Sequence, residues 1–500
     1  MQLPELFAHA GRAAFWAAVG KWIDLVGGAL TFLCMVRLLQ PHDFGVYGLS
    51  LLVILAPETI VAGALSECLI QRPELRPGHV SATALLQLII APLMGVGLVF
   101  AAPWIAGALR HSELRMLVPL MAGTLVLLAL AATPAALLQR ELRFRAIAIV
   151  DAAGTLVASA VGLTMAFTGH GVWSLAWMEI VRRAVRAAGF LAATGWSLTV
   201  WPSKADFADL THFNLTSLAM RLVIQADSAI PRLFLGVASA SALGYFNLAQ
   251  RIFQQFSALF IAPFNGIALP VASRIQGQRT KLHAALDGAS RVSTLVAYPI
   301  FLGGAAIAPV AIPMLLGKTW APATAAVQIM LLLGLRAATA SFNGGVLRAV
   351  GKPGLQLLLV TIGVAINASI APFAAAWGAT AIAAVFLARG LVTWALGAML
   401  IQHVVGYPAT RQFSIGWESM VSAIVMAVVV SGARLGLGDV GSAPIRLAGA
   451  IVLGAATYTL TLRLLAPATV RSFTQIAAAL CRRDRAGAAA LAYAWAQPSN

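Results

Sequence analysis

The chain consists almost entirely of apolar runs that are long enough to cross a membrane. A helix needs about 20 mostly apolar residues to span the hydrocarbon core of a bilayer. Prolines, turn residues and charged groups divide the sequence into such runs, at residues 13–37, 44–68, 80–101, 114–138, 145–168, 171–194, 209–232, 242–266, 291–316, 323–347, 354–376, 378–402, 416–437 and 444–465. Hydrophobic residues make up 60% of the chain and charged residues 10%, which leaves too little polar sequence to cover these runs in a soluble core. We therefore expect an all-α polytopic membrane protein of about 14 transmembrane helices.

The formal net charge of +17 comes from basic residues that stand singly or in small groups between the apolar runs. This pattern is typical of membrane topology signals and differs from the clustered basic face of a nucleic-acid-binding domain. Lys and Arg are concentrated in the loops on the same side as the amino terminus. This bias predicts that both termini face the cytoplasm, and no nucleic acid is expected as a partner.

The sequence contains no recognisable catalytic or metal-binding motif. Its three cysteines, Cys34, Cys68 and Cys481, are widely spaced, and its eight histidines are scattered. It has no HExxH, no GxSxG and no Gly-rich phosphate loop. We therefore expect a transporter without catalytic residues, metal or cofactor.

Weak similarities between the two halves of the chain predict an internal repeat. The stretch FGVYGLSLLVI from Phe44 aligns with LGYFNLAQRIF from Leu243, and two further pairs of stretches align in the same order at similar spacing. A shift of six spans preserves the direction of each helix, so the repeats are parallel. We predict an N-terminal lobe at residues 1–195 with spans 1–6, and a C-terminal lobe at 209–405 with spans 7–12. A cytoplasmic lobe linker at 196–208, spans 13 and 14 at 406–466 and a cytoplasmic tail at 467–500 complete the chain.

An ordered series of motifs resembles a known family. The motifs are RLLQPHDFGVYGLS (37–50), LLQRELRFRAIA (137–148), GHGVWSL (169–175), LGYFNLAQRI (243–252), LPVASRIQ (269–276) and LLGKTWAPA (315–323). Together they resemble the polysaccharide transport family of Wzx-type flippases, in the multidrug, oligosaccharidyl-lipid and polysaccharide exporter superfamily.

This resemblance implies a flippase of the bacterial cytoplasmic (inner) membrane, serving exopolysaccharide, O-antigen or capsule biosynthesis. Its substrate would be undecaprenyl-pyrophosphate-linked oligosaccharide repeat units, carried from the cytoplasmic to the periplasmic leaflet. Membrane lipids, a polysaccharide polymerase and chain-length or export proteins would be its other partners. The resemblance also implies that spans 1, 2, 7 and 8 line the cleft.

Several cations fall inside the predicted spans, where a charged side chain costs roughly 3 kcal/mol on insertion scales. Arg182 and Arg183 lie in the stretch WMEIVRRAVRAAGF of span 6, and Lys21 and Arg221 lie at related positions of spans 1 and 7. Arg251 in span 8 is a weaker candidate. Because arginine stays charged and bonds phosphate oxygens bidentately, we predict that these residues hold the pyrophosphate during alternating access. The alternative is local ion pairing that lets the cations reach the membrane surface.

Acidic residues accompany these cations within the spans. Asp24, Glu58, Glu179 and Asp227 are the candidates, together with Asp151. Glu179 stands three and four residues before Arg182 and Arg183, within ion-pairing reach on a helix. These acids either serve as counter-ions or couple transport to protons or sodium, and the sequence leaves both open.

Three other functions compete with this interpretation. A multidrug antiporter would need an acidic cavity, which the surplus of arginine argues against. A flippase for lipid-linked peptidoglycan precursors is chemically closer, but the motifs favour the polysaccharide branch. A membrane-embedded polysaccharide polymerase or ligase would need a large periplasmic loop, and no predicted outer loop is large.

Overall fold

A computed structural model describes residues 3–72, 74–197, 200–262, 278–437 and 442–481. The described residues form helices joined by short turns, with no strand among them, so the all-α prediction is confirmed. Within these residues ten helices are long and apolar enough to cross a membrane. The protein is therefore a multi-pass membrane protein.

The chain divides into two compact units, Met1–Gly244 and Tyr245–Asn500. The first unit contains α1 (Leu3–Leu38), α2 (Pro41–Glu58), the π-helical turn η1 (Thr59–Gly63), α3 (Ala64–Gln71), α4 (Pro77–Leu109), α5 (Leu114–Arg140), α6 (Phe144–Phe167), α7 (Val172–Thr194) and α8 (Lys204–Ala238). Within this unit α5 packs against α4 and α7, while α6 packs against α1 and α7. The helices α2, α3 and α4 all contact α8.

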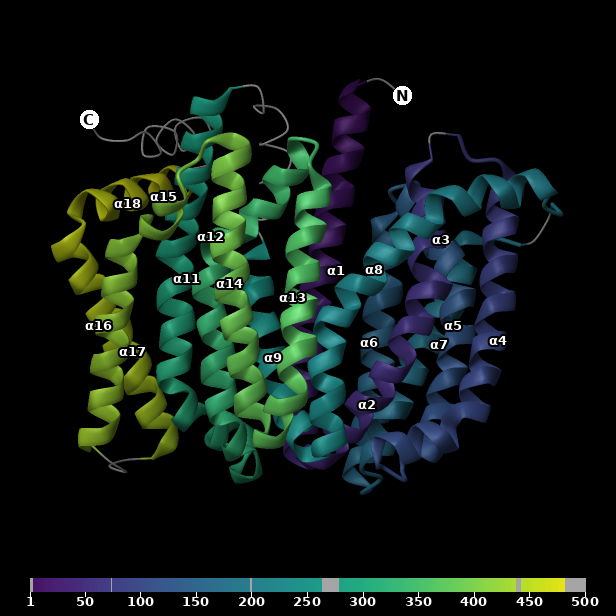
Figure 1. Cartoon of the computed structure of the whole chain (residues 1–500), viewed down its shortest axis with the longest axis horizontal. Helices are drawn as coiled ribbons and strands as arrows, with labels where there is room; N and C mark the ends of the chain where they lie inside the picture. The colour runs from purple at the N-terminus through teal and green to yellow at the C-terminus, as the bar shows by residue number, and fades with distance from the viewer. Residues whose placement is uncertain (1–2, 73, 198–199, 263–277, 438–441, 482–500) are drawn as a thin grey trace. The chain divides into compact units, whose positions relative to one another are not determined.

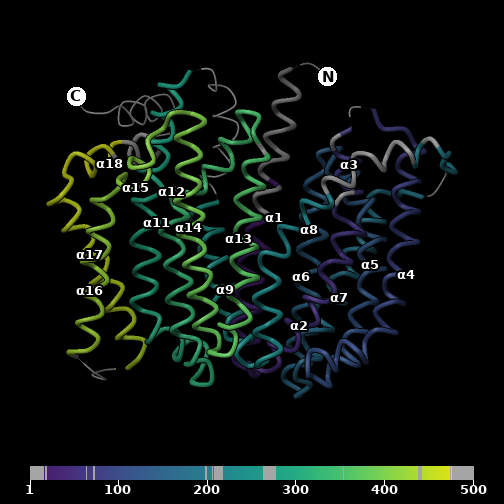
Figure 2. The backbone as a smooth tube through the Cα atoms, viewed as in Figure 1, coloured from purple at the N-terminus to yellow at the C-terminus, as the bar shows by residue number. Residues whose placement is uncertain are grey.

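The second unit begins within α9 (Ala240–Phe260). It continues with α11 (Arg279–Leu316), η2 (Lys318–Ala323), α12 (Thr324–Ala349), α13 (Pro353–Ala374), η3 (Ala375–Trp377), α14 (Ala379–Val405), α15 (Ala409–Ser414), α16 (Trp417–Leu437), α17 (Ala443–Leu465) and α18 (Pro467–Cys481). In Figures 1 and 2, α11, α12 and α14 run side by side, and α16 and α17 form an antiparallel pair.

The predicted lobes stay a prediction. Their linker is predicted at 196–208, but residues 204–208 already form the start of α8, and the division between the two compact units falls later, after Gly244. Of the predicted tail, residues 467–481 form α18, and the remainder lies outside the described residues. The loop motif at 269–276 lies entirely outside the described residues, within the range 263–277.

Two glycines allow a close, reciprocal contact inside the first unit. A side chain on Gly45 of α2 would overlap the carbonyl of Ala240, and one on Gly244 would overlap the carbonyl of Pro41. Only residues without a Cβ permit such an approach of backbone to backbone. The start of α2 is therefore packed directly on the segment that follows α8.

A buried polar cluster fixes the α14–α15 connection in the second unit. The Asp287 carboxylate, on α11, is almost fully buried. It accepts hydrogen bonds from the Tyr407 hydroxyl at 2.5 Å and from Arg411 Nε at 3.1 Å. Asn343 and Gln412, also buried, exchange two amide hydrogen bonds at 3.2 and 2.7 Å. These contacts satisfy the polar groups that the short helix α15 brings inside.

Candidate functional site

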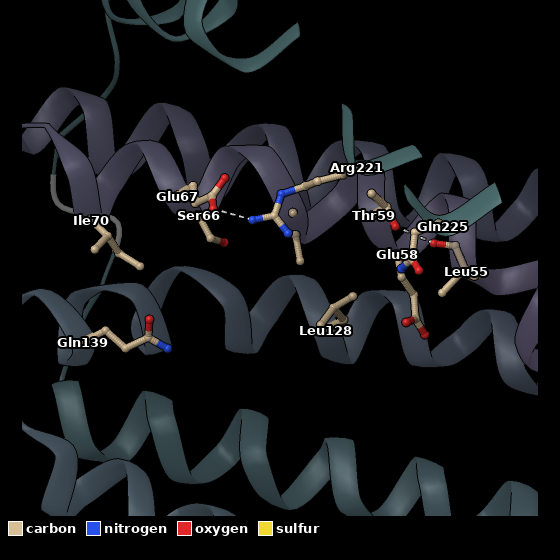
Figure 3. A pocket seen from close by; sticks show the side chains of 12 residues that line it. Leu55, Glu58, Thr59, Ser66, Glu67, Ile70, Leu128, Gln139, Arg221 and Gln225 are labelled. Atoms are coloured by element: carbon tan, nitrogen blue, oxygen red, sulfur yellow. Dashed lines mark hydrogen bonds and ion pairs between the residues drawn. The ribbon is translucent and has the colours of Figure 1, made fainter. Parts of the chain in front are cut away.

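A cavity of about 580 Å³ lies in the first unit, between the α2–η1–α3 segment, α5 and α8 (Figure 3). Its lining residues come from those elements and are Leu55, Glu58, Thr59, Ala62, Gly63, Ser66, Glu67, Ile70, Leu128, Gln139, Arg221 and Gln225. A second cavity of about 220 Å³ shares Ala62, Ser66 and Gln139 with it and extends to Arg183 and Arg186 on α7. The two cavities therefore adjoin, and cations from α7 and α8 line them.

The wall of the larger cavity is a broken helix. Pro57 lies near the end of α2, where it removes a backbone donor and its ring disturbs the preceding turn. The chain then forms a single π-helical turn, Thr59–Gly63, before α3 continues. The Thr59 hydroxyl donates to the Leu55 carbonyl at 2.8 Å, in addition to the Thr59 backbone N–H that donates to the same carbonyl at the break. Turns of this type inside α-helices occur frequently at functional sites.

Helix α7 brings two arginines onto one buried carboxylate. The side chain of Glu179 is 6% exposed; it accepts from Arg183 Nε at 2.6 Å and also pairs with Arg182. Arg183, 13% exposed, pairs in addition with Glu58 at the end of α2. The helix begins after Gly171 and ends before Gly195, both in conformations with positive φ that favour glycine. The predicted pairing of Glu179 with both arginines is present in the structure.

A second pair follows one turn further along α7. Arg186 Nε lies 2.8 Å from Asp151 Oδ1 on α6, and its guanidinium stands over the Phe190 ring at 5.5 Å. Arg186 lines the smaller cavity, and the carboxylate of Asp151, on the neighbouring helix α6, neutralises the charge of its guanidinium. Asp151 is thus a counter-ion in this structure.

Arg221 of α8 lies at the larger cavity and pairs with Glu67 of α3 (Figure 3). Its aliphatic stem passes over Gly63, since a Cβ on Gly63 would lie 3.3 Å from Arg221 Cδ. Sequence reasoning did not single out Glu67. Its position inside the second predicted span was the available signal, because an acid at that depth needs a cationic partner.

The remaining predicted residues line neither cavity. Lys21 on α1 is exposed, and Asp24 accepts a hydrogen bond from the Thr155 hydroxyl at 2.8 Å. Asp227 is half-buried on α8, and Arg251 is exposed on α9 in the second unit. A binding or coupling role for each of them stays a prediction.

The charges around the two cavities are balanced by pairs. Arg183, Arg186 and Arg221 each meet a carboxylate from a different helix. Among the described residues, however, no hydrogen-bond partner satisfies Arg183 Nη1. An anionic ligand in this space would find several donors in place and could exchange with the carboxylates. The described residues hold no group of three or more metal-ligating side chains.

Sequence comparisons with known proteins find proteins of polysaccharide biosynthesis. Residues 34–325 match the family model described as "Polysaccharide biosynthesis protein". The chain is 24% identical over 492 residues to the succinoglycan biosynthesis transport protein ExoT of Rhizobium meliloti (strain 1021), covering 96% of this chain and 98% of ExoT. It is 23% identical over 360 residues to the lipopolysaccharide biosynthesis protein WzxC of Escherichia coli (strain K12), covering 69% of each.

The fold also has a counterpart among solved structures. The structure described as "Lipid II flippase MurJ, inward closed conformation" superposes with a TM-score of 0.74, over 90% of this chain and 98% of that one. Sequence identity between the two is 13%, so the likeness concerns the fold.

Proposed function

The chain belongs to the polysaccharide biosynthesis protein family, and from this we propose that it moves undecaprenyl-pyrophosphate-linked oligosaccharide repeat units across the bacterial inner membrane, from the cytoplasmic to the periplasmic leaflet. The resemblance to Wzx-type flippases is confirmed by this family match and by the similarity to ExoT and WzxC. Exopolysaccharide, O-antigen or capsule biosynthesis is the process that such units feed.

The observation that carries this proposal is the pair of adjoining cavities with arginine on their walls. A lipid pyrophosphate is a multiply charged anion that cannot enter hydrocarbon without neutralisation. Arg183 and Arg221 supply cations that no physiological pH removes, and their planar groups match phosphate oxygens. Arg182, whose side chain is 48% exposed, adds a third cation on the same carboxylate as Arg183.

The cavity walls also suit the rest of the substrate. Gln139, Gln225 and Ser66 line the larger cavity and provide donors and acceptors for sugar hydroxyls. The prenyl chain can stay among membrane lipids while the headgroup crosses. A polysaccharide polymerase and chain-length or export proteins would receive the product, and they are its proposed partners.

We include fourteen spans in the proposal. The ten apolar helices become fourteen if α1, α7, α8 and α9 also cross the membrane. These four helices carry the intramembrane charges or a run of polar residues, which lowers their hydropathy, and each contains at least the roughly 20 residues that a crossing needs. With an even number of spans and the basic loops inside, both termini face the cytoplasm.

The reciprocal glycine contacts support the parallel repeat. Pro41 and Gly45 are four residues apart, as are Ala240 and Gly244. The Ala240 carbonyl packs against Gly45, and the Pro41 carbonyl packs against Gly244. Such an exchange is expected where two repeats meet about a symmetry axis. Alternating access would then proceed by movement of one six-helix lobe against the other.

The proposal includes coupling of transport to protons or sodium. Glu58 and Glu179 share Arg183, and Asp24 and Asp227 lie on the predicted cleft helices α1 and α8. A carboxylate freed from its arginine by the substrate could bind a cation and return it on release.

A leaflet-protection assay tests the function. Purified protein is placed in liposomes with undecaprenyl-pyrophosphate-linked oligosaccharide, and a glycan-modifying reagent outside the vesicles counts accessible headgroups over time. We expect transbilayer exchange that protein-free vesicles lack. Exchange of a lipid-linked peptidoglycan precursor, without exchange of the oligosaccharide substrate, would assign the protein to the alternative function, and no exchange of either lipid would refute the proposal.

A further inference from the structure

The broken second span carries two acids that could not share one face of a regular helix. Glu58 and Glu67 are nine residues apart, and both line the larger cavity. In an uninterrupted α-helix, nine steps of about 100° would leave the two side chains about 180° apart. The two side chains would then project from opposite sides of the helix.

The π-helical turn between them changes this relation. A π-turn bonds i to i+5 and so holds one residue more than an α-turn. The extra residue rotates everything after it back by about 100°, which leaves Glu58 and Glu67 about 80° apart. Glu58 then reaches Arg183 on α7, while Glu67 reaches Arg221 on α8. Figure 3 shows the two acids on either side of the Arg221 guanidinium along this span.

The turn η1 orients Glu67, and it also contacts Arg221, with which Glu67 pairs. Gly63 is the last residue of η1, and a Cβ there would lie 3.3 Å from Arg221 Cδ and 3.9 Å from Nε. Glu67 pairs with one terminal nitrogen, Nη2. The stem of Arg221 is thus supported by η1, and its tip is held by the helix that η1 orients.

We propose that η1 is a positioning element that sets Glu67 opposite Arg221, and that Glu67 is the counter-ion to which Arg221 returns when substrate leaves. This inference rests on the proposed function, since it takes a pyrophosphate headgroup as the ligand of Arg221. Transport requires binding that is strong enough for entry and weak enough for release. A carboxylate that competes for the same guanidinium lowers the affinity for the anion and speeds its departure.

The first test removes the extra residue. Deletion of Ile60, a residue of η1 that lines neither cavity, converts the π-turn to an α-turn and leaves both flanking helices on their present faces. We expect this variant to fold, as judged by a monodisperse profile in detergent, and to flip substrate within about threefold of wild type. The control deletes Val157 from the unbroken helix α6, which rotates half of that helix and should abolish folding. Equal damage from both deletions would overturn the proposed register.

The second test reads the register without transport. Native cysteines are first replaced (Cys34→Ser, Cys68→Ala and Cys481→Ser), and a short bifunctional thiol reagent is applied in membranes. Glu67→Cys with Arg221→Cys should cross-link at least five times faster than Ser66→Cys with Arg221→Cys. In an unbroken helix position 66 would take the place of 67, so equal rates or the reverse order would overturn the inference. This result does not depend on whether the protein flips any lipid.

The third test separates positioning from general damage. Glu67→Gln removes the competing charge, so both the KM for undecaprenyl-pyrophosphate-linked oligosaccharide and the kcat should fall, each by about fivefold or more. Glu67→Asp keeps the charge and should restore both values toward wild type. A variant that is merely damaged would raise KM and lower kcat, and that pattern in Glu67→Gln would overturn the role of Glu67.

Discussion

The pairing of Glu58 with Arg183 predicts a large, non-additive effect on stability. Arg183 is 13% exposed and Glu58 23%, so both charges lie mostly away from water. Removing one partner of a buried ion pair costs about 3–5 kcal/mol, because the other charge stays buried without compensation. Arg183→Gln leaves the Glu58 carboxylate buried without a cation and should have this full cost. Glu58→Gln leaves Arg183 paired with Glu179, so we expect a smaller loss of stability for this variant, about 2 kcal/mol.

The double variant should be less destabilised than the sum of the single ones. Once Arg183 is replaced, Glu58→Gln removes the uncompensated charge, so the coupling free energy should be about 2–3 kcal/mol. Equilibrium unfolding in mixed detergent micelles, followed by circular dichroism, gives the four free energies of the cycle.

A surface pair provides the matched control for this cycle. Glu141 and Arg143 lie 3.5 Å apart in the turn between α5 and α6, with side chains 57% and 48% exposed. Such pairs contribute about 0–1 kcal/mol, so their cycle should be close to additive. If the Glu58–Arg183 cycle were also additive within about 0.5 kcal/mol, the argument from burial would be refuted.

The remaining predictions concern positions away from the cavities. Tyr407→Phe leaves the buried Asp287 without its 2.5 Å hydrogen bond and should lower the free energy of unfolding by about 1–3 kcal/mol in the same assay. Alanine at Gly45 or Gly244 should each cost about 1–3 kcal/mol, since the new Cβ overlaps a carbonyl; stability equal to wild type would contradict the close contact. Hydrogen bonds from the Ser203 hydroxyl and amide lower the pKa of Asp206, so this group stabilises the fold above its unfolded pKa and the contribution disappears as pH falls through the folded value. An unfolding series against pH should therefore show a weaker loss of stability at acid pH in Asp206→Asn than in wild type.

Helix positions were predictable because local signals set them. The run at 114–138 corresponds to α5, Leu114–Arg140, and the run at 171–194 corresponds to α7, Val172–Thr194. Gly171 and Gly195 supply the positive φ at both ends of α7, and such turn chemistry is visible in sequence. The pairing of Glu179 with Arg182 and Arg183 was also accessible, since it depends only on helical spacing.

Contacts between helices could not be predicted from the sequence in the same way. Pro57 marks a break, but whether the chain responds with a kink or a π-turn depends on what packs against it. The partner of Arg221 follows from that choice, so Glu67 could not be assigned to it from spacing alone. Lys21 and Arg251 also lie inside predicted spans, but neither lines a cavity. The position of a residue along a span does not determine whether its side chain points toward a cavity.

The central claim, that arginines on the cavity wall carry the anionic headgroup, is tested most directly by initial flipping rates of single variants. Arg221→Ala removes a charged donor from the larger cavity, whereas Arg115→Ala removes an exposed cation at the start of α5. In liposomes with undecaprenyl-pyrophosphate-linked oligosaccharide, we predict a rate at least about tenfold below wild type for Arg221→Ala, or about 1.4 kcal/mol, and an unchanged rate for Arg115→Ala. A wild-type rate for Arg221→Ala, in protein recovered from the membrane at normal yield, would contradict the account.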